Sequence, residues 1–314
     1  MNPEYLPMNA AALMDRVFDL YKATFKTQIA FSLIIGIVSF ILMILLGIML
    51  AFAVGVAMGV TGYMDERYIL MMAAVVLIGV LPLYMGWIYL SASGHILITK
   101  QAFYGEPIEF PFRDAVGAFL RVITAAIAQL VMALPFLALL AYLVYSAVAG
   151  HDDIIYLIMN IHPAILIFGG LAFTIFYVIY SNIFALSIPA AIFERRVFFA
   201  TVSRSFVLLK GDFWKILGLR LLWALLIFLF SYSAQGLLMF LVAALAAFAG
   251  NIMDFGTLWV TTGPLQFYAS LFVSILVGPM EGIMTALIYF NQKIKKDGLD
   301  IEIGIFRLAR GAAL

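Results

Sequence analysis

Long uncharged runs of apolar residues recur along this chain. No charged residue lies between Ile29 and Val60, or between Ile154 and Phe193. A membrane-spanning helix needs about 20 apolar residues, and both runs are longer than that. Hydrophobic residues make up 66% of the 314 residues and charged residues only 11%, which is too little charge for a soluble surface. The sequence therefore predicts an all-α, polytopic membrane protein.

Six transmembrane helices are predicted from these runs. They cover about residues 29–60, 68–98, 122–149, 164–193, 213–249 and 265–290. The run 154–193 is roughly twice as long as one span requires. Because Pro163 disfavours helix at the residue before it, we expect a short interfacial or re-entrant piece before a span that starts near residue 164. Residues 251–263 are expected to form a loop.

The basic residues orient the predicted spans. Every Lys and Arg except Arg67 falls in the terminal segments or in the loops 99–121 and 194–220. Cytoplasmic loops carry an excess of Lys and Arg, so both termini are predicted to lie in the cytoplasm. The expected location is the inner or plasma membrane, with the acidic loop 151–153 on the outer side.

An amphipathic pattern appears three times. Apolar residues recur at spacings of four, three and four, which places them on one helix face. The three sets are Met14, Phe18, Tyr21 and Phe25; Phe112, Val116, Phe119 and Ile123; and Val202, Phe206, Leu209 and Phe213. The first and third also share identities, with Arg16, Leu20 and Lys22 at the spacing of Arg204, Leu208 and Lys210. The first helix, over about 10–25, is expected to be capped by Asn9.

These patterns predict a single transmembrane domain over residues 1–314 that contains three repeats. Each repeat would be an interfacial helix followed by a transmembrane hairpin, over about residues 10–100, 108–193 and 198–296. Each amphipathic helix would either lie in the headgroup plane with its apolar side down or pack on the bundle as a cap.

Catalytic and metal-binding patterns are missing from the sequence. It has no Cys, and its three histidines, His95, His151 and His162, have no ligand partner at helical spacing. No Gly-rich phosphate loop or nucleophile elbow is present. We therefore expect a protein that is not an enzyme, with no cofactor, no metal and no nucleic-acid partner.

Glu281 is the one carboxylate inside a predicted span. Gly278 and Gly282 flank it, and Pro279 frees the carbonyl of Ile275. Carriers use a carboxylate beside a disrupted helix to bind ions, so Glu281 is a candidate substrate or ion site if it faces the bundle interior. The alternative, which the sequence favours, is a hydrogen-bonded Glu that holds helices together. Its candidate partners are Gln129, Asn182 and Gln235.

Cations beside the predicted spans are candidates for contact with anionic lipid headgroups. They are Arg16, Lys22, Arg195, Arg196, Arg204, Lys210, Lys293, Lys295 and Lys296. Such contacts contribute about 1 kcal/mol per cation near a membrane surface. Setting the topology is a sufficient alternative role for these residues. Arg204 and Lys210 have a further alternative, pairing with Glu194 and Asp212.

Two segments resemble motifs of a known group of proteins. The segment Leu287–Ile303 carries Tyr289, Lys293, Lys295, Lys296, Asp297, Gly298 and Asp300, with Asn291 where the group has an acid and Lys293 where it has Arg. The segment Ile188–Lys210 carries Pro189, Glu194, Arg204, Ser205 and Leu208. Both are similar to motifs of multi-pass proteins related to the membrane domain of glycerophosphodiester phosphodiesterases. The resemblance implies a six-helix membrane domain, and it implies no diesterase activity because that chemistry belongs to a separate soluble barrel.

The expected function is that of a non-enzymatic scaffold or partner subunit that contacts lipid headgroups or other membrane proteins. A second copy of the chain is one of the expected partners. The alternative is a carrier of a small or amphipathic solute with Glu281 as its intramembrane coupling site. A cavity that reaches Glu281 would favour the carrier, and a densely packed bundle would favour the scaffold.

Overall fold

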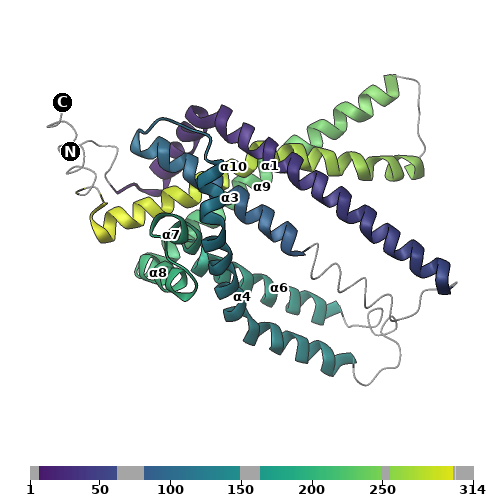
Figure 1. Ribbon diagram of the computed structural model, residues 1–314, viewed down its shortest axis with the longest axis horizontal. Coiled ribbons are helices and arrows are strands. Elements are labelled where there is room, and N and C mark those ends of the chain that lie inside the picture. Colours follow the sequence, from purple (N-terminus) through teal and green to yellow (C-terminus); the bar gives the residue numbers. More distant parts are fainter. Residues whose placement is uncertain (1–6, 62–80, 149–162, 249–254, 300, 302–314) are drawn as a thin grey trace. The chain divides into compact units, whose positions relative to one another are not determined.

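The computed structural model describes residues 7–61, 81–148, 163–248, 255–299 and 301, and all of its regular elements in these ranges are helices (Figure 1). The prediction of an all-α protein is confirmed for this part of the chain. The helices are α1 (Ala10–Thr61), α3 (Leu81–Tyr104), α4 (Phe112–Val148), α6 (Pro163–Phe184), α7 (Ser187–Phe193), α8 (Phe199–Leu209), α9 (Phe213–Phe248) and α10 (Phe255–Asp297).

Five stretches of the described helices are long and apolar enough to cross a membrane, which makes the chain a multi-pass membrane protein by helix length and composition. They are Ala10–Met49, Phe112–Leu139, Gly169–Phe193, Phe213–Leu241 and Ala269–Asp297. The predicted span 68–98 lies partly in α3 and partly on residues 62–80, which are outside the described ranges. Six spans in three repeats therefore stay a prediction.

The N-terminal part of the chain forms one continuous helix. Asn9 caps it as predicted, since its Oδ1 accepts a hydrogen bond from the backbone N–H of Ala12 at 2.8 Å. The prediction of a separate interfacial helix over 10–25 is wrong, because α1 runs from Ala10 to Thr61 without interruption. The second amphipathic segment likewise continues from Phe112 into α4.

The third amphipathic segment is a separate helix, as predicted. Helix α8 ends at Leu209, and Gly211 has a backbone φ of +90°, a conformation that residues with a side chain rarely adopt. Helix α9 starts at Phe213, where the sequence predicted the fifth span to begin. The apolar stripe is split in the structure: Val202 and Leu209 are buried, whereas Phe206 is about half exposed.

Other boundaries differ from the predicted ones. The fourth predicted span, 164–193, starts at Pro163 but is broken at residues 185–186 between α6 and α7. Residues 255–263, which were expected to be a loop, form the start of α10. That helix also continues past the predicted end of the sixth span to Asp297. The predicted re-entrant piece and the acidic loop 151–153 lie outside the described residues.

Two groups of residues pack as compact units. Among the described residues, unit 1 contains 7, 120–148, 163–221, 288–299 and 301, and unit 2 contains 8–61, 81–119, 222–248 and 255–287. In unit 1, α6 and α7 pack on α8, and Val202 lies in a buried cluster with Ala128 and Phe184.

In unit 2, α1 packs along α3. Phe31, Ile35, Ile98 and Ala115 form a buried cluster at this contact. Gly94 leaves the space that the ring of Phe31 fills, because a Cβ added at this glycine would collide with the ring. The close approach of α1 and α3 therefore depends on a residue without a side chain.

Candidate functional site

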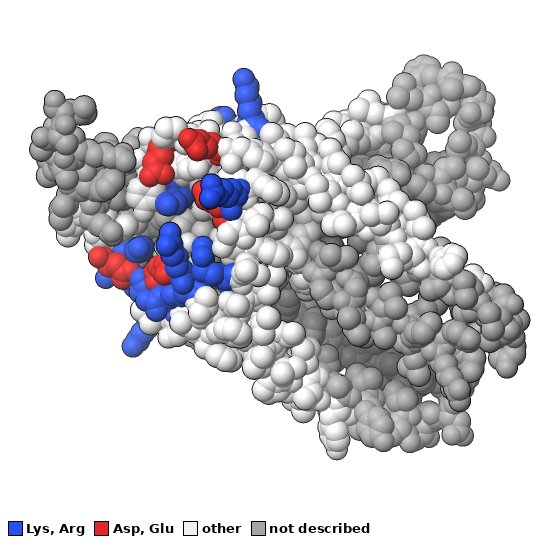
Figure 2. Space-filling view, viewed as in Figure 1, with Lys and Arg blue, Asp and Glu red and all other residues white. Residues whose placement is uncertain are grey.

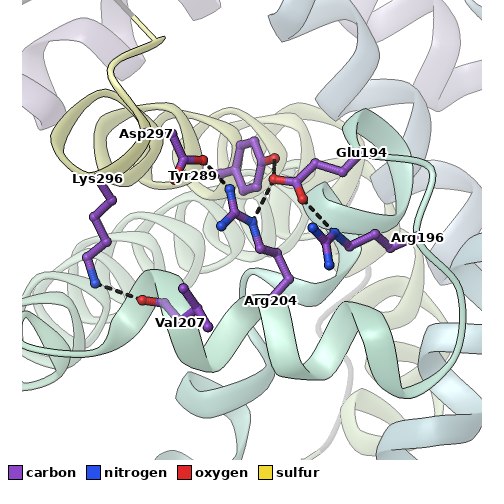
Figure 3. A network of polar contacts seen from close by, with 7 residues as sticks. All are labelled: Glu194, Arg196, Arg204, Val207, Tyr289, Lys296 and Asp297. Atoms are coloured by element: carbon purple, nitrogen blue, oxygen red, sulfur yellow. Dashed lines mark hydrogen bonds and ion pairs between the residues drawn. The ribbon is translucent and has the colours of Figure 1, made fainter.

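A network of charged and polar side chains in unit 1 joins three segments (Figure 3). Glu194 follows α7, Arg204 lies in the middle of α8, and Tyr289 and Asp297 lie in the last turns of α10. These residues belong to the two motif segments picked out by the sequence, which are about 95 positions apart. The fold therefore places both motifs in one site.

Glu194 is the centre of this network. Its Oε1 accepts hydrogen bonds from Arg204 Nε at 2.8 Å and from the Tyr289 hydroxyl at 2.7 Å. Its Oε2 accepts from Arg196 Nε at 2.7 Å. The Arg204 guanidinium also donates through Nη2 to Asp297 Oδ2. Planar guanidinium groups suit such paired contacts, and hydrogen bonds between charged groups are stronger than neutral ones.

The ionic form of the network is favoured by its own contacts. Burial by itself raises the pKa of the Glu194 carboxyl, but hydrogen bonds from Tyr289, Arg204 and Arg196 outweigh this effect, and the pKa lies below its ordinary value. For Arg204, burial lowers the pKa, and the contacts with Glu194 and Asp297 more than compensate. Both side chains therefore stay charged although they are largely covered.

A second group of contacts fixes the turn between α8 and α9. The Lys296 ammonium, from the end of α10, donates to the backbone carbonyls of Val207 at 2.8 Å and Lys210 at 2.5 Å. These carbonyls lie at the C-terminus of α8, where helix carbonyls lack intrahelical partners. Asp212 lies 3.5 Å from both Lys215 and Lys295. Burial is the largest single influence and raises the pKa of the Asp212 carboxyl, but the Lys295 charge, hydrogen bonds from Gln292 and Lys295 and the Lys215 charge together outweigh it, and the pKa is lowered.

Exposed apolar and basic residues surround this network. One group of charged atoms in Figure 2 lies where Figure 1 places α7 and α8. The large exposed apolar residues between positions 194 and 220 are Val197, Phe198, Phe199, Phe206, Val207 and Trp214. Arg195 and Phe198 have positive backbone φ angles of 53° and 50°. Residues other than glycine adopt such angles only at a cost of about 1–3 kcal/mol.

The predicted lipid-contact cations differ in their surroundings. Arg204, Lys295 and Lys296 are engaged by groups of unit 1, so for Arg204 the structure supports the alternative of pairing with Glu194. Arg195 and Lys210 are exposed, and Arg196 is 44% exposed although it contacts Glu194. Lys293 is half-buried. Arg16 and Lys22 lie on α1 in unit 2, where Lys22 is exposed.

Glu281 does not have the predicted environment. Its side chain is exposed, whereas the next residues, Gly282 and Ile283, are buried. An enclosed position for Glu281 is therefore not what the structure shows, and its role as a substrate or ion site stays a prediction. The physical reason for the exposure is the helical phase: Gly282 is the residue of this turn that meets α3, where a Cβ would collide with the His95 side chain.

The predicted polar partners of Glu281 have other contacts of their own. Gln129 donates to the Ser187 hydroxyl at 2.5 Å, and Gln235 accepts a hydrogen bond from the Ser270 hydroxyl at 3.3 Å. Both bonds connect different helices, as expected for residues that hold helices together. Asn182 is fully buried, and neither atom of its amide has a hydrogen-bond partner among the described residues.

His95 belongs to a buried polar cluster in unit 2 that the sequence did not predict. Its Nδ1 donates to Gln28 Oε1 at 2.5 Å, since a carbonyl oxygen only accepts. Its Nε2 lies 3.2 Å from the hydroxyls of Ser32 and Ser91. All the polar atoms of the ring have partners, so the cluster reads as structural packing between α1 and α3. The signal available in the sequence was the polar positions Gln28 and Ser32 in an apolar run.

Comparisons of this chain with family models, with curated proteins and with solved structures give no match.

Proposed function

We propose that the protein is a non-catalytic, multi-pass membrane scaffold with both termini in the cytoplasm, whose basic segment between α7 and α9 lies at the cytoplasmic headgroup layer. The observation that carries this proposal is the position of the Glu194 network. It joins the end of one apolar stretch at Phe193 with the end of another at Asp297, and it lies just before a third that starts at Phe213.

Charged groups favour the water-facing ends of membrane helices, because burial of a charge in hydrocarbon costs several kcal/mol. A network that joins two such ends and lies next to a third supports an arrangement with all three on the same side of the bilayer. The basic character of residues 194–220 supports the cytoplasm as that side. The network would hold the helix ends in fixed positions, which is what a scaffold needs in order to present a constant surface to lipids or to other proteins.

Single-cysteine labelling tests this arrangement cleanly, because the chain has no natural Cys. We would place one cysteine per variant, R195C, K293C or D152C, and treat intact cells and inside-out vesicles with a membrane-impermeant maleimide. R195C and K293C are expected to react only from the cytoplasmic side, and D152C only from the outer side. Labelling of R195C and D152C from the same side would contradict the proposed function.

A further inference from the structure

Helix α8 is apolar on both faces: it buries Val202, Leu208 and Leu209, and it also exposes large apolar side chains, which is unusual for a helix on a soluble surface. Phe199, Phe206 and Val207 are each about half exposed, and Ser203 lies on the same face. Thr201 and Ser205 lie on the buried face, where the Ser205 hydroxyl donates to the backbone carbonyl of Ile183 at 2.6 Å. The exposed face of α8 is therefore suited to an apolar environment.

Basic residues lie at both ends of this face. Arg195 and Arg196 precede α8, and Lys210 and Lys215 follow it; all four are exposed. The acids of the same segment, Glu194 and Asp212, are mostly covered and each contacts cations within unit 1. The surface of α8 thus combines an apolar centre with exposed positive charge, and its acidic groups are already neutralised.

The position of α8 in the chain indicates which environment covers its exposed apolar face. The helix has 11 residues, about 16 Å at 1.5 Å per residue, too short to cross the hydrocarbon core. It connects an apolar stretch that ends at Phe193 to one that starts at Phe213. If both cross the membrane, as in the proposed function on which this inference rests, α8 lies in the headgroup layer.

We propose that α8 is a docking surface for anionic phospholipids. Phe199, Phe206 and Val207 enter the boundary between headgroups and acyl chains, and Arg195, Arg196, Lys210 and Lys215 contact the phosphates. Amphipathic helices with a basic rim bind membrane surfaces in this way, through buried apolar area together with attraction to anionic lipids.

The test uses the full chain, delipidated in a neutral detergent. Native mass spectrometry would follow the binding of phosphatidylglycerol and of phosphatidylcholine with the same acyl chains. The triple variant R195Q/K210Q/K215Q removes exposed cations beside α8 and leaves the Glu194 network intact. The charge-matched control K22Q/K26Q/R113Q removes three exposed cations of unit 2.

We expect the wild-type protein to prefer phosphatidylglycerol by about tenfold, the α8 variant to lose about tenfold in affinity for it, and the control to lose less than about twofold. Equal affinity for the two lipids, or an equal loss in both variants, would overturn the proposal.

A second readout examines the apolar face directly. A nitroxide at S203C in nanodiscs should be accessible to oxygen and protected from a water-soluble nickel complex. Full accessibility to the nickel complex would also overturn the proposal. Neither readout depends on which side of the membrane α8 occupies, so the maleimide labelling tests the proposed function separately.

Discussion

Residues 16–25 and 204–213 have closely related sequences and different structures. The first segment lies inside α1, which continues to Thr61, whereas the second contains the end of α8, a turn and the start of α9. The helix of the second segment ends just before two aligned positions at which the two sequences differ. Ala23 and Thr24 stand in the first segment where Gly211 and Asp212 stand in the second.

The local chemistry explains both outcomes. Ala favours helix, and the Thr24 hydroxyl bonds back to the carbonyl of Leu20 at 2.7 Å within the same helix. Gly211 takes a φ of +90° at little cost, and the carbonyl of Asp212 accepts the first hydrogen bond of α9, from Ile216. Lys296 then satisfies the free carbonyls at the end of α8. An amphipathic pattern therefore gives a helix and its face but does not say where the helix ends.

The largest expected effect concerns the contacts that only the second segment makes. R204Q removes the charge that Glu194 and Asp297 share. Breaking a buried ion pair costs about 3–5 kcal/mol, and because these side chains are partly exposed we expect a loss of about 2–3 kcal/mol in unfolding free energy. Thermal unfolding in detergent, followed by circular dichroism, measures it. R113Q, on an exposed residue, should change stability by less than about 0.5 kcal/mol.

Acidification should weaken the same contacts. The pKa of Glu194 in the folded protein lies below its ordinary value of 4.5, so its contribution to stability is complete above pH 4.5 and is lost as the pH falls through the folded pKa. The pKa of Asp212 is likewise lowered, from an ordinary value of 3.8, so its contribution to stability is also lost as the pH falls. Wild-type protein should lose more stability below pH 4.5 than E194Q does, and identical pH profiles would rule out this role for Glu194.

A smaller effect is expected from the turn itself. A left-handed conformation costs residues with a Cβ about 1–2 kcal/mol, so G211A should destabilise the protein by about that amount. Apart from its chain neighbours, none of the described residues has an atom within 4 Å of the added Cβ, so the effect would come from the backbone alone. The matched control is G117A in α4, where the added Cβ also meets nothing; there the helix should gain up to about 1 kcal/mol. Stabilisation by G211A would contradict the proposed role of this glycine.

The smallest effect is expected from placing a glycine at the aligned position of the first segment. A23G should cost about 1 kcal/mol, the usual penalty of glycine inside a helix. Helix α1 should remain continuous, since it extends without a break on both sides of this position, from Ala10 to Thr61. Far-ultraviolet circular dichroism should therefore change little, and a loss of helix content would show that a glycine alone is enough to end the helix.

Local chemistry made some features predictable from sequence. The apolar runs predicted the membrane class, and Asn9 and Pro163 marked helix starts where the structure has them. The break at residues 185–186 was missed, although Pro189 follows Ala185 by four positions and a proline ring clashes with the carbonyl four residues before it. The side to which Glu281 points was missed too, because the packing of Gly282 on His95 decides it.

The site itself was predictable only in part. The sequence offered Glu194 as a partner for Arg204, ten positions away, because both belong to one basic amphipathic segment. It had no means to place Tyr289 or Asp297 beside them, since these contacts span more than 90 positions and depend on how α10 meets α8. The motif resemblance named both segments but did not indicate that they touch.

The most direct test of this account is a double-mutant cycle between Glu194 and Tyr289, read out as unfolding free energy. The single variants E194A and Y289F each remove the hydrogen bond that joins the α7–α8 segment to α10. A hydrogen bond to a charged group predicts a coupling energy of about 1.5–3 kcal/mol. Effects that add to within about 0.3–0.5 kcal/mol would show that the two segments are not joined there.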